Sequence, residues 1–141
     1  MSRKHIRYLD LFAGAGGLSE GFIRAGFTPV AHVESDPSAA YTLKTRAVYH
    51  HLREKGDFSE YVSYLNGGIG RDTLYKSVPV SLTGSVINDT IGGRTLKRIF
   101  SQVDGLLDGS RLDLIIGGPP CQAYSLVGRS RSDTGMKGDS R

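Results

Sequence analysis

Short apolar runs alternate with segments of helical periodicity along the chain. Each predicted helix repeats its apolar residues every three or four positions, and glycines or capping residues stand between the runs. The pattern predicts strands at 7–12, 29–33, 85–87 and 112–116, and helices at 18–25, 37–49 and 96–107. This repeated alternation predicts an α/β fold with a doubly wound, mostly parallel sheet and right-handed crossovers.

Two of these helices carry further signals of their start and of the face they bury. Asp36 is an N-cap residue and Pro37 takes the first helical position, so the second helix should begin there. The apolar positions of this helix, which should face the sheet, are Ala40, Leu43 and Ala47. The apolar face of the third helix comprises Leu96, Ile99, Phe100, Val103 and Leu107.

Residues 50–84 are less regular, and we interpret them as a helical insertion. Asp57-Phe58-Ser59-Glu60 has the spacing of a capping box, so Asp57 is expected to cap a helix. The apolar stripe of this helix consists of Phe58, Tyr61, Val62 and Leu65.

The chain has 141 residues, about one domain's worth, and a net charge of +4. This mildly basic balance permits a polyanionic partner without requiring one. A single cysteine excludes an internal disulfide, and four scattered histidines lack zinc-site spacing, so no metal is expected. No apolar stretch is long enough to cross a bilayer and residues 1–5 do not start a signal sequence, so we expect an intracellular protein.

Glycines at 14, 16 and 17 follow the first predicted strand and open the first helix. Such a loop lets backbone N–H groups approach a ligand, and Glu34, twenty residues after Gly14, is placed to take the hydroxyls of a ribose. NAD, FAD and S-adenosylmethionine all contain a ribose that such a loop and carboxylate could bind. The alternative is a tight turn that binds no ligand. Ser19 stands where the dinucleotide fingerprint has its third glycine, so NAD and FAD fit poorly.

The only cysteine lies in the loop after the fourth predicted strand. Residues 117–122 read Gly-Gly-Pro-Pro-Cys-Gln, which cannot continue as strand or enter a helix at once, so a rigid turn is expected. A lone cysteine is ordinarily a small buried hydrophobe. At the carboxyl end of a strand in an α/β sheet, where ligands and chemistry collect, Cys121 is instead a candidate nucleophile.

Two motifs, in the same order along the chain, resemble the DNA cytosine-5 methyltransferase family. They are Asp-Leu-Phe-Ala-Gly-Ala-Gly-Gly-Leu at 10–18 and Gly-Pro-Pro-Cys-Gln-Ala-Tyr-Ser at 118–125. Glu34-Ser35-Asp36 resembles the family's acidic element after the second strand, and residues 138–141 resemble the segment behind its active-site loop. The resemblance implies a Rossmann-like methyltransferase fold that uses S-adenosylmethionine.

The resemblance also divides the chain into functional parts. Residues 1–141 would form one partial catalytic domain, with a cofactor loop at 10–18 and a catalytic cysteine loop at 117–141 on either side of the insertion at about 50–84. The last fifteen residues, 127–141, are nearly free of apolar side chains and are expected to be a mobile loop, with an ordinary frayed terminus as the alternative.

The cofactor residues follow from the same resemblance. Those that would shape the pocket are Phe12, Ala13, Gly14, Gly16, Gly17, Leu18 and Pro120. Glu34 would bind the ribose, and Ser35 would lie beside the adenine. The family's polar residue for the adenine amino group is best matched by Asn88-Asp89, for which a plain turn is an equal alternative. Gly56-Asp57 is a weaker match, because Asp57 has a role as a helix cap.

The implied reaction explains why a cysteine is needed. Carbon 5 of cytosine is too poor a nucleophile, so the Cys121 thiolate would add to carbon 6 and push electrons toward carbon 5. The target base would be turned out of the duplex. Gln122 and Ser125 would contact nucleic acid near the site. Arg129 and Arg131 are candidate phosphate contacts, with solvated loop charges as the alternative.

The pattern departs from the family after Arg141. The family would supply there a glutamate that holds the cytosine and a target-recognition region, and neither is found. We therefore expect a cofactor-side portion with little activity alone, completed by a missing carboxy-terminal portion or a second chain. DNA is the expected substrate, within a restriction–modification system of the bacterial cytoplasm. A tRNA substrate, or a non-catalytic module that binds S-adenosylmethionine or nucleic acid, are the alternatives.

Overall fold

The computed structural model describes residues 5–121, which form four strands and six helices. In chain order these are β1 (Arg7–Leu11), α1 (Gly17–Arg24), β2 (Thr28–Glu34), α2 (Pro37–Lys55), α3 (Ser59–Leu65), α4 (Arg71–Lys76), α5 (Val80–Gly84), β3 (Val86–Asn88), α6 (Leu96–Leu107) and β4 (Leu114–Gly117). Every predicted strand and helix is present, with ends that differ by a few residues. No helix in this range is both long and apolar enough to span a bilayer.

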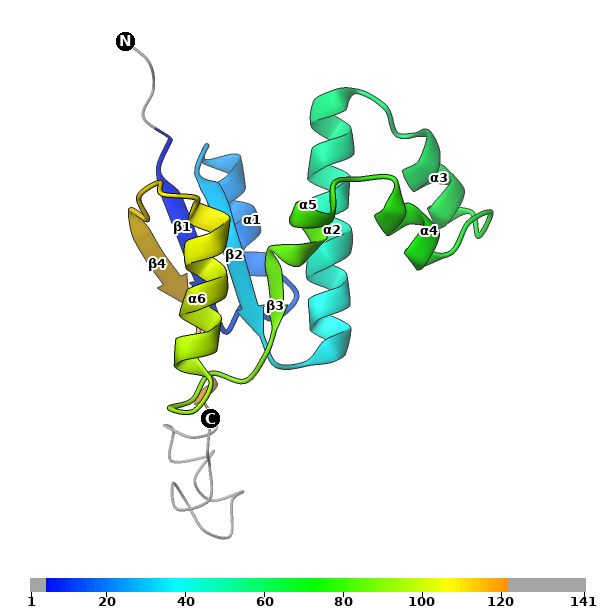
Figure 1. Cartoon of the computed structure of the whole chain (residues 1–141). Helices are drawn as coiled ribbons and strands as arrows, with labels where there is room; N and C mark the ends of the chain where they lie inside the picture. The colour runs from blue at the N-terminus through cyan, green and yellow to red at the C-terminus, as the bar shows by residue number, and fades with distance from the viewer. Residues whose placement is uncertain (1–4, 122–141) are drawn as a thin grey trace, which may run out of the picture.

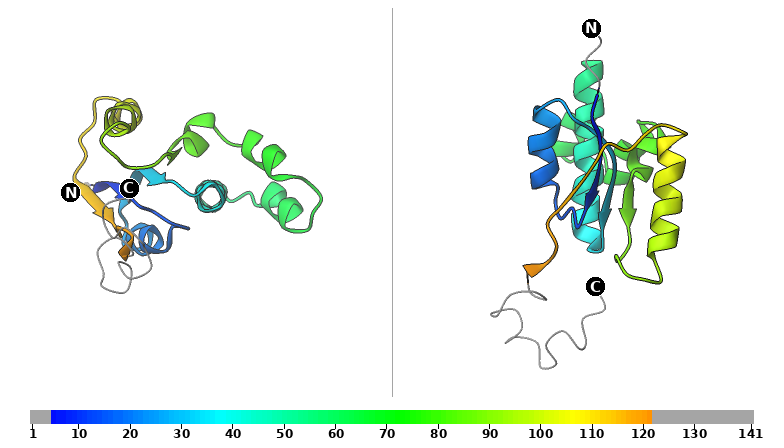
Figure 2. Two further views of the ribbon diagram at one scale, coloured as in Figure 1. Left: turned by 90° about the horizontal axis from the view of Figure 1, so that it is seen from below. Right: turned by 90° about the vertical axis from the view of Figure 1, so that its left-hand side faces the viewer.

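The four strands form one parallel sheet in the order β3-β2-β1-β4 (Figure 1). The chain winds outward from β1 to β3 and then crosses to the other side of β1 to form β4. Helices α1 and α6 cover opposite faces of the sheet (Figure 2). This arrangement confirms the predicted doubly wound α/β fold. It also brings the carboxyl ends of all four strands to one edge, and the strand order reverses between β1 and β4.

The main core lies between the sheet and α6. Its buried members are Leu9, Val30, Ala31, Val33, Ile87, Ile99, Val103 and Leu107. The predicted apolar face of α6 is therefore the face that packs on the sheet, although Phe100 at its margin is 42 % exposed. Burial on this scale is the main stabilising term of the fold.

Helix α2 continues to Lys55, past the end expected near Tyr49. After Pro37 its sequence contains no further proline and no glycine until Gly56, which adopts a φ of 72° and ends the helix in the left-handed conformation. The added length buries Val48 and Leu52 in a second cluster of apolar side chains. The contacts that stabilise these turns come from distant residues, and helical periodicity alone does not reveal them.

Ala40 and Leu43 of the predicted α2 face are buried, and burial departs from the apolar pattern at one position of α2 and one of α1. In α2, Ala47 is only partly buried, and its neighbour Val48 is fully buried. In α1, Leu18 is 49 % exposed, and the small polar Ser19 beside it is buried. A buried serine requires hydrogen-bond partners inside the protein, and the sheet supplies them, as described below.

The segment predicted as an insertion contains α3, α4 and α5, and its first two helices project to one side of the sheet (Figure 1). A small core holds it to α2 and consists of Val48, Leu52, Leu74 and Val78. Val62 and Leu65 of the predicted stripe are exposed, so only part of that face is buried. Asp57 accepts the backbone N–H of Ser59 at 3.0 Å, while Phe58 occupies the N-cap position itself.

Candidate functional site

The carboxyl ends of the four strands border one cavity of about 420 Å³. Its lining residues are Phe12, Val33, Glu34, Ser35, Asp36, Asp89, Thr90, Ile91, Gly118 and Pro120. The predicted cofactor residues within this lining are Phe12, Glu34, Ser35, Asp89 and Pro120. Those outside it are Ala13, Gly14, Gly16, Gly17, Leu18 and Asn88. The fold thus gathers residues from four separate loops around one space, as a ligand site in an α/β sheet requires.

Phe12 leaves β1 in an unusual backbone conformation. Its φ is 56°, in the left-handed region that bulky side chains rarely adopt. The backbone N–H of Ala13 donates to the carbonyl of Val33 at 3.0 Å, which ties the strained turn to β2. Strain of this kind persists where surrounding contacts impose it, and it concentrates at functional sites. The conformation places Phe12 in the cavity lining instead of in the sheet.

Glu34, at the end of β2, connects the glycine loop to the start of α2. One carboxylate oxygen accepts the N–H of Gly14 at 2.7 Å, and the other accepts the N–H of Asp36 at 2.8 Å. A carboxylate offers about four acceptor positions, so these two bonds leave capacity for further donors. The Ser35 hydroxyl also donates to it at 3.4 Å, so the side chain is held in place and keeps about one acceptor position for a ligand hydroxyl group.

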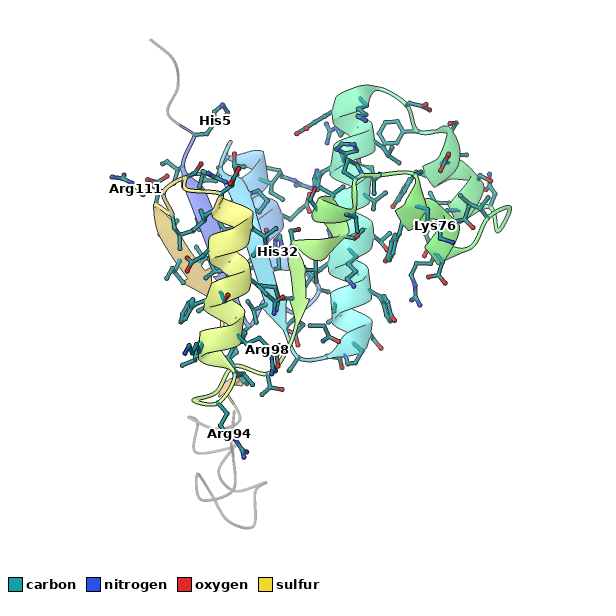
Figure 3. The ribbon with its side chains drawn as sticks, in the orientation of Figure 1. His5, His32, Lys76, Arg94, Arg98 and Arg111 are labelled. Atoms are coloured by element: carbon teal, nitrogen blue, oxygen red, sulfur yellow. The ribbon has the colours of Figure 1, made fainter. Side chains whose placement is uncertain are left out.

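Asn88 and Asp89, which follow β3, have different roles. The Asn88 amide donates to the carbonyls of Glu34 at 2.8 Å and Ser35 at 3.1 Å, so it fixes the neighbouring loop from outside the cavity. Asp89 lines the cavity, and its carboxylate accepts two N–H groups from Arg98 at 2.9 and 2.6 Å. Arg98 lies near the edge where β3 ends (Figure 3). Of this pair, Asp89 is the better placed to meet a ligand.

The glycine loop brings the start of α1 close to α2. Gly16 is the residue before the helix, with a φ of 90°, and a Cβ there would approach the Leu43 side chain to 2.9 Å. A Cβ on Gly14 or Gly17 would meet no atom within 4 Å, so backbone there borders open space. Since Gly16 supplies no side-chain cap, the first N–H groups of α1 are available to an acceptor.

Cys121 is exposed and directly follows Pro120 in the cavity lining. Its loop departs from β4 beside β1, where Gly117 pairs with Leu11. A Cβ on Gly117 would overlap the Leu11 carbonyl oxygen, so only glycine permits this close approach. Four predicted nucleic-acid contacts lie outside the described residues and stay predictions: Gln122, Ser125, Arg129 and Arg131.

Asp10, two residues before Phe12, is a buried acid that sequence reasoning did not single out. It is 1 % exposed at the end of β1, and neither carboxylate oxygen has a hydrogen-bond partner within the described structure. Burial raises the pKa of Asp10 to about 6, and the nearby Glu34 carboxylate adds to the shift. An acid in a buried strand, just before a glycine loop, was the available signal. Asp10 does not line the cavity, so its charge can act on a ligand there only through space.

A buried hydrogen-bond chain beneath the glycine loop was also not foreseen. The Tyr8 hydroxyl contacts the Ser19 hydroxyl, which lies 2.8 Å from Nε2 of His32. This chain fixes α1 to β1 and β2, and it explains why a serine stands where the dinucleotide fingerprint has a glycine. Burial lowers the pKa of His32 to about 4, so the ring is neutral near pH 7. Nothing in the linear pattern brings these three residues together.

Asp10 and His32 are expected to affect stability in opposite directions with pH. The folded state keeps the Asp10 proton up to about pH 6, so this contribution falls as pH rises from about 4 to 6. The unfolded state binds the His32 proton more readily, so that contribution grows from about pH 4 to 6.5. In an Asp10→Asn protein only the His32 contribution of these two remains. Its free energy of unfolding should rise with pH more steeply than that of the wild type, as measured by denaturant titration.

Asp104→Asn is the matched control for this comparison, because Asp104 is exposed on α6. Its stability curve should run parallel to that of the wild type from about pH 4 to 6.5. If the Asp10→Asn curve is also parallel, Asp10 is not a buried acid with a raised pKa.

The sequence model of the C-5 cytosine-specific DNA methylases matches residues 6–79, just over half of the chain. The type II methyltransferase M.Bpa9945I of Bacillus paralicheniformis is 40 % identical over 153 residues, covering 94 % of this chain and 34 % of that protein. M.AquIA of a Picosynechococcus species is 31 % identical over 123 residues, covering 87 % of this chain and 35 % of its own length. M.XorII of Xanthomonas oryzae is 35 % identical over 125 residues, covering 89 % of this chain and 21 % of that protein.

This chain therefore spans about a third or less of the length of these relatives. No solved structure gives a significant match. The family match begins at β1 and includes the glycine loop, Glu34 and α2. It confirms the resemblance carried by the glycine-loop motif, and the chain belongs to the C-5 cytosine-specific DNA methylase family.

Proposed function

We propose that this chain binds S-adenosylmethionine at the carboxyl edge of its sheet and supplies the nucleophile of a DNA cytosine-5 methyltransferase. The observation that carries the proposal is the 420 Å³ cavity, where Phe12, Glu34 and Asp89 meet the loop that leads to Cys121. Family membership supports the reaction type. The relatives are named type II methyltransferases, which supports DNA as substrate and a restriction–modification setting.

The residues around the cavity suit this cofactor. Apolar side chains of Phe12, Val33 and Ile91 suit an adenine ring, and Glu34 keeps acceptor capacity for a ribose hydroxyl. The methionine part of the cofactor carries an ammonium and a sulfonium, and the unpaired Asp10 carboxylate supplies negative charge beside the glycine loop. When bound, the cofactor provides a methyl group made electrophilic by the sulfonium.

The reaction would proceed through a covalent bond to the base. The Cys121 thiolate adds to carbon 6 of a cytosine turned out of the duplex, and the electron pair moves toward carbon 5. Carbon 5 then takes the methyl group. Loss of the proton from carbon 5 restores the double bond and expels the thiolate. Cys121 is exposed, as an attacking thiol must be.

Isothermal titration calorimetry with S-adenosylhomocysteine tests the cofactor assignment. The product cofactor is expected to bind the chain, whereas NAD and FAD should not, because Ser19 is committed to the hydrogen-bond chain under the glycine loop. Binding of NAD or FAD without binding of S-adenosylhomocysteine would favour an oxidoreductase and contradict the proposal.

Glu34→Gln is expected to weaken S-adenosylhomocysteine binding by about 10- to 100-fold. The change removes the charge that strengthens hydrogen bonds to ribose hydroxyls, and it replaces one acceptor oxygen by a donor. Because Glu34 also holds Gly14, part of the loss reflects a looser glycine loop. The control is Glu60→Gln on the exposed surface of α3, which should bind like the wild type. Equal affinities of the three proteins for S-adenosylhomocysteine would show that Glu34 does not contribute to the binding site.

A further inference from the structure

A larger groove, of about 890 Å³, lies over α2 and is separate from the candidate site. Its walls come from α1 on one side and from α3 and α4 on the other, with α2 between them (Figure 2). None of its lining residues borders the 420 Å³ cavity. The groove is therefore a second surface that the proposed reaction does not use.

The groove is strongly basic. Four arginines line it, namely Arg24, Arg46, Arg53 and Arg71. The one carboxylate in the lining, Glu20, is already engaged by Arg46 at 3.2 Å and by His50 at 3.0 Å. Among residues 5–121, no carboxylate forms an ion pair with the other three arginines. Within the described part of the chain, Arg24, Arg53 and Arg71 thus have no ion-pair partner.

Aromatic residues also line the groove, where one contacts an arginine and others carry hydroxyl groups that can donate hydrogen bonds. The guanidinium of Arg71 lies 3.5 Å from the centre of the Tyr41 ring, a cation–π contact that holds the charge at the wall. Tyr49, Tyr61 and Tyr64 also line the groove, and no hydrogen bond to their hydroxyls occurs within the described part of the chain. Arginine and tyrosine donors of this kind are those that contact phosphate oxygens.

The position and length of the groove suit an extended polyanion. It begins at Ser38, two residues after Asp36 in the lining of the candidate site, and it continues along α2 to Arg53. This stretch of helix is about 22 Å long. One strand of B-DNA carries about six phosphates over that distance. Arg46 and Arg53 lie seven residues apart on α2, about 10 Å along its axis, so the basic residues are spread along the groove.

We propose that the α2 groove binds the phosphate backbone of duplex DNA that flanks the target base. The inference rests on the proposed function, because DNA held at the candidate site would extend from the cavity toward the Ser38 end of the groove. These contacts would add affinity and fix the direction of the duplex without reading its sequence.

The test is a salt titration of binding to a fluorescein-labelled duplex of about 25 base pairs, followed by fluorescence anisotropy. The groove variant combines Arg24→Gln, Arg53→Gln and Arg71→Gln. The control variant combines Lys76→Gln, Lys97→Gln and Arg111→Gln, which remove the same charge from exposed residues outside the groove (Figure 3 labels Lys76 and Arg111). Thermal unfolding and S-adenosylhomocysteine titration check that each variant is folded with an intact cofactor site.

A plot of the logarithm of the DNA association constant K against the logarithm of salt concentration has a negative slope. In the groove variant this slope should be less steep by about 2.7, since each of the three lost phosphate contacts removes about 0.9. Between 50 and 200 mM salt, the wild type should then lose about 40-fold more affinity than the groove variant. Equal slopes for the groove and control variants would overturn the proposal. If S-adenosylhomocysteine fails to bind but the groove slope changes, the cofactor assignment fails and the groove assignment stands.

Discussion

In the enzyme completed by its carboxy-terminal portion or a second chain, Cys121→Ser is expected to abolish the covalent complex with duplex DNA that contains 5-fluorocytosine. In the wild type, the thiolate adds to carbon 6 and the methyl group joins carbon 5. Fluorine at carbon 5 cannot leave as a proton does, so the protein stays attached. A serine hydroxyl is not ionised near neutral pH and adds too weakly. Methyl transfer to ordinary cytosine should fall by at least about 10⁴-fold, the scale seen when a catalytic nucleophile is removed.

The measurement is mass spectrometry or denaturing gel electrophoresis of the protein–DNA complex, with S-adenosylmethionine present. Cys121 is the only cysteine of the chain, so no second thiol can substitute for it. The Cys121→Ser protein should bind S-adenosylhomocysteine like the wild type, because the thiol is needed for the covalent step and not for the cofactor. A complex that persists in this variant would assign the nucleophile to another residue.

Gly117→Ala is expected to lower the free energy of unfolding by about 2–3 kcal/mol and the melting temperature by about 10 °C. The new methyl group would overlap the carbonyl oxygen of Leu11, a backbone atom of the adjacent strand that cannot turn aside. Relief of this overlap requires β4 to separate from β1 at the point where the catalytic loop begins. The change should therefore also weaken S-adenosylhomocysteine binding, because Gly118 and Pro120 would move with the strand end.

Gly118→Ala is the matched control, since a Cβ at that adjacent position would meet no atom within 4 Å. Its stability should stay within about 0.5 kcal/mol of the wild type. Denaturant unfolding of the three proteins gives both values. Equal stabilities for the two alanine variants would show that β4 does not approach β1 as closely as described.

Much of this fold is visible in the linear pattern because its elements are of regular kinds. The central strands β1 and β2 are short apolar runs with consecutive buried residues, whereas Ile115 of β4, at the edge of the described sheet, is 53 % exposed. The helices repeat one apolar face, so both periodicities can be recognised in the sequence. Asp36 and Pro37 mark the start of α2 correctly because capping is a local interaction. The prediction of its end near Tyr49 was wrong, because Val48 and Leu52 are stabilised by residues of a later segment.

The residues of the candidate site likewise fall into those that the sequence identified and those whose roles only the structure revealed. Glycines, Glu34 and the cysteine loop are recognisable because each lies directly after a predicted strand, and parallel strands bring their carboxyl ends together. The roles of Asn88 and Asp89 were not separable in sequence, since adjacent polar residues look alike. The structure distinguishes them: Asn88 binds the backbone of the β2 loop, and Asp89 faces the cavity.

The order of the elements along the chain and the placement of the one thiol after the last predicted strand therefore follow from local residue chemistry. The close approach of Gly117 to Leu11 depends on the packing of β4 against β1. The pairing of Ser19 with Tyr8 and His32, the unpaired burial of Asp10 and the arginine-lined groove over α2 depend on the packed chain. Backbone conformation depends largely on neighbouring residues, so it can be predicted from the sequence. Burial, charge pairing and cavity shape are set by residues far apart in the chain, which meet only when the sheet and its helices pack together.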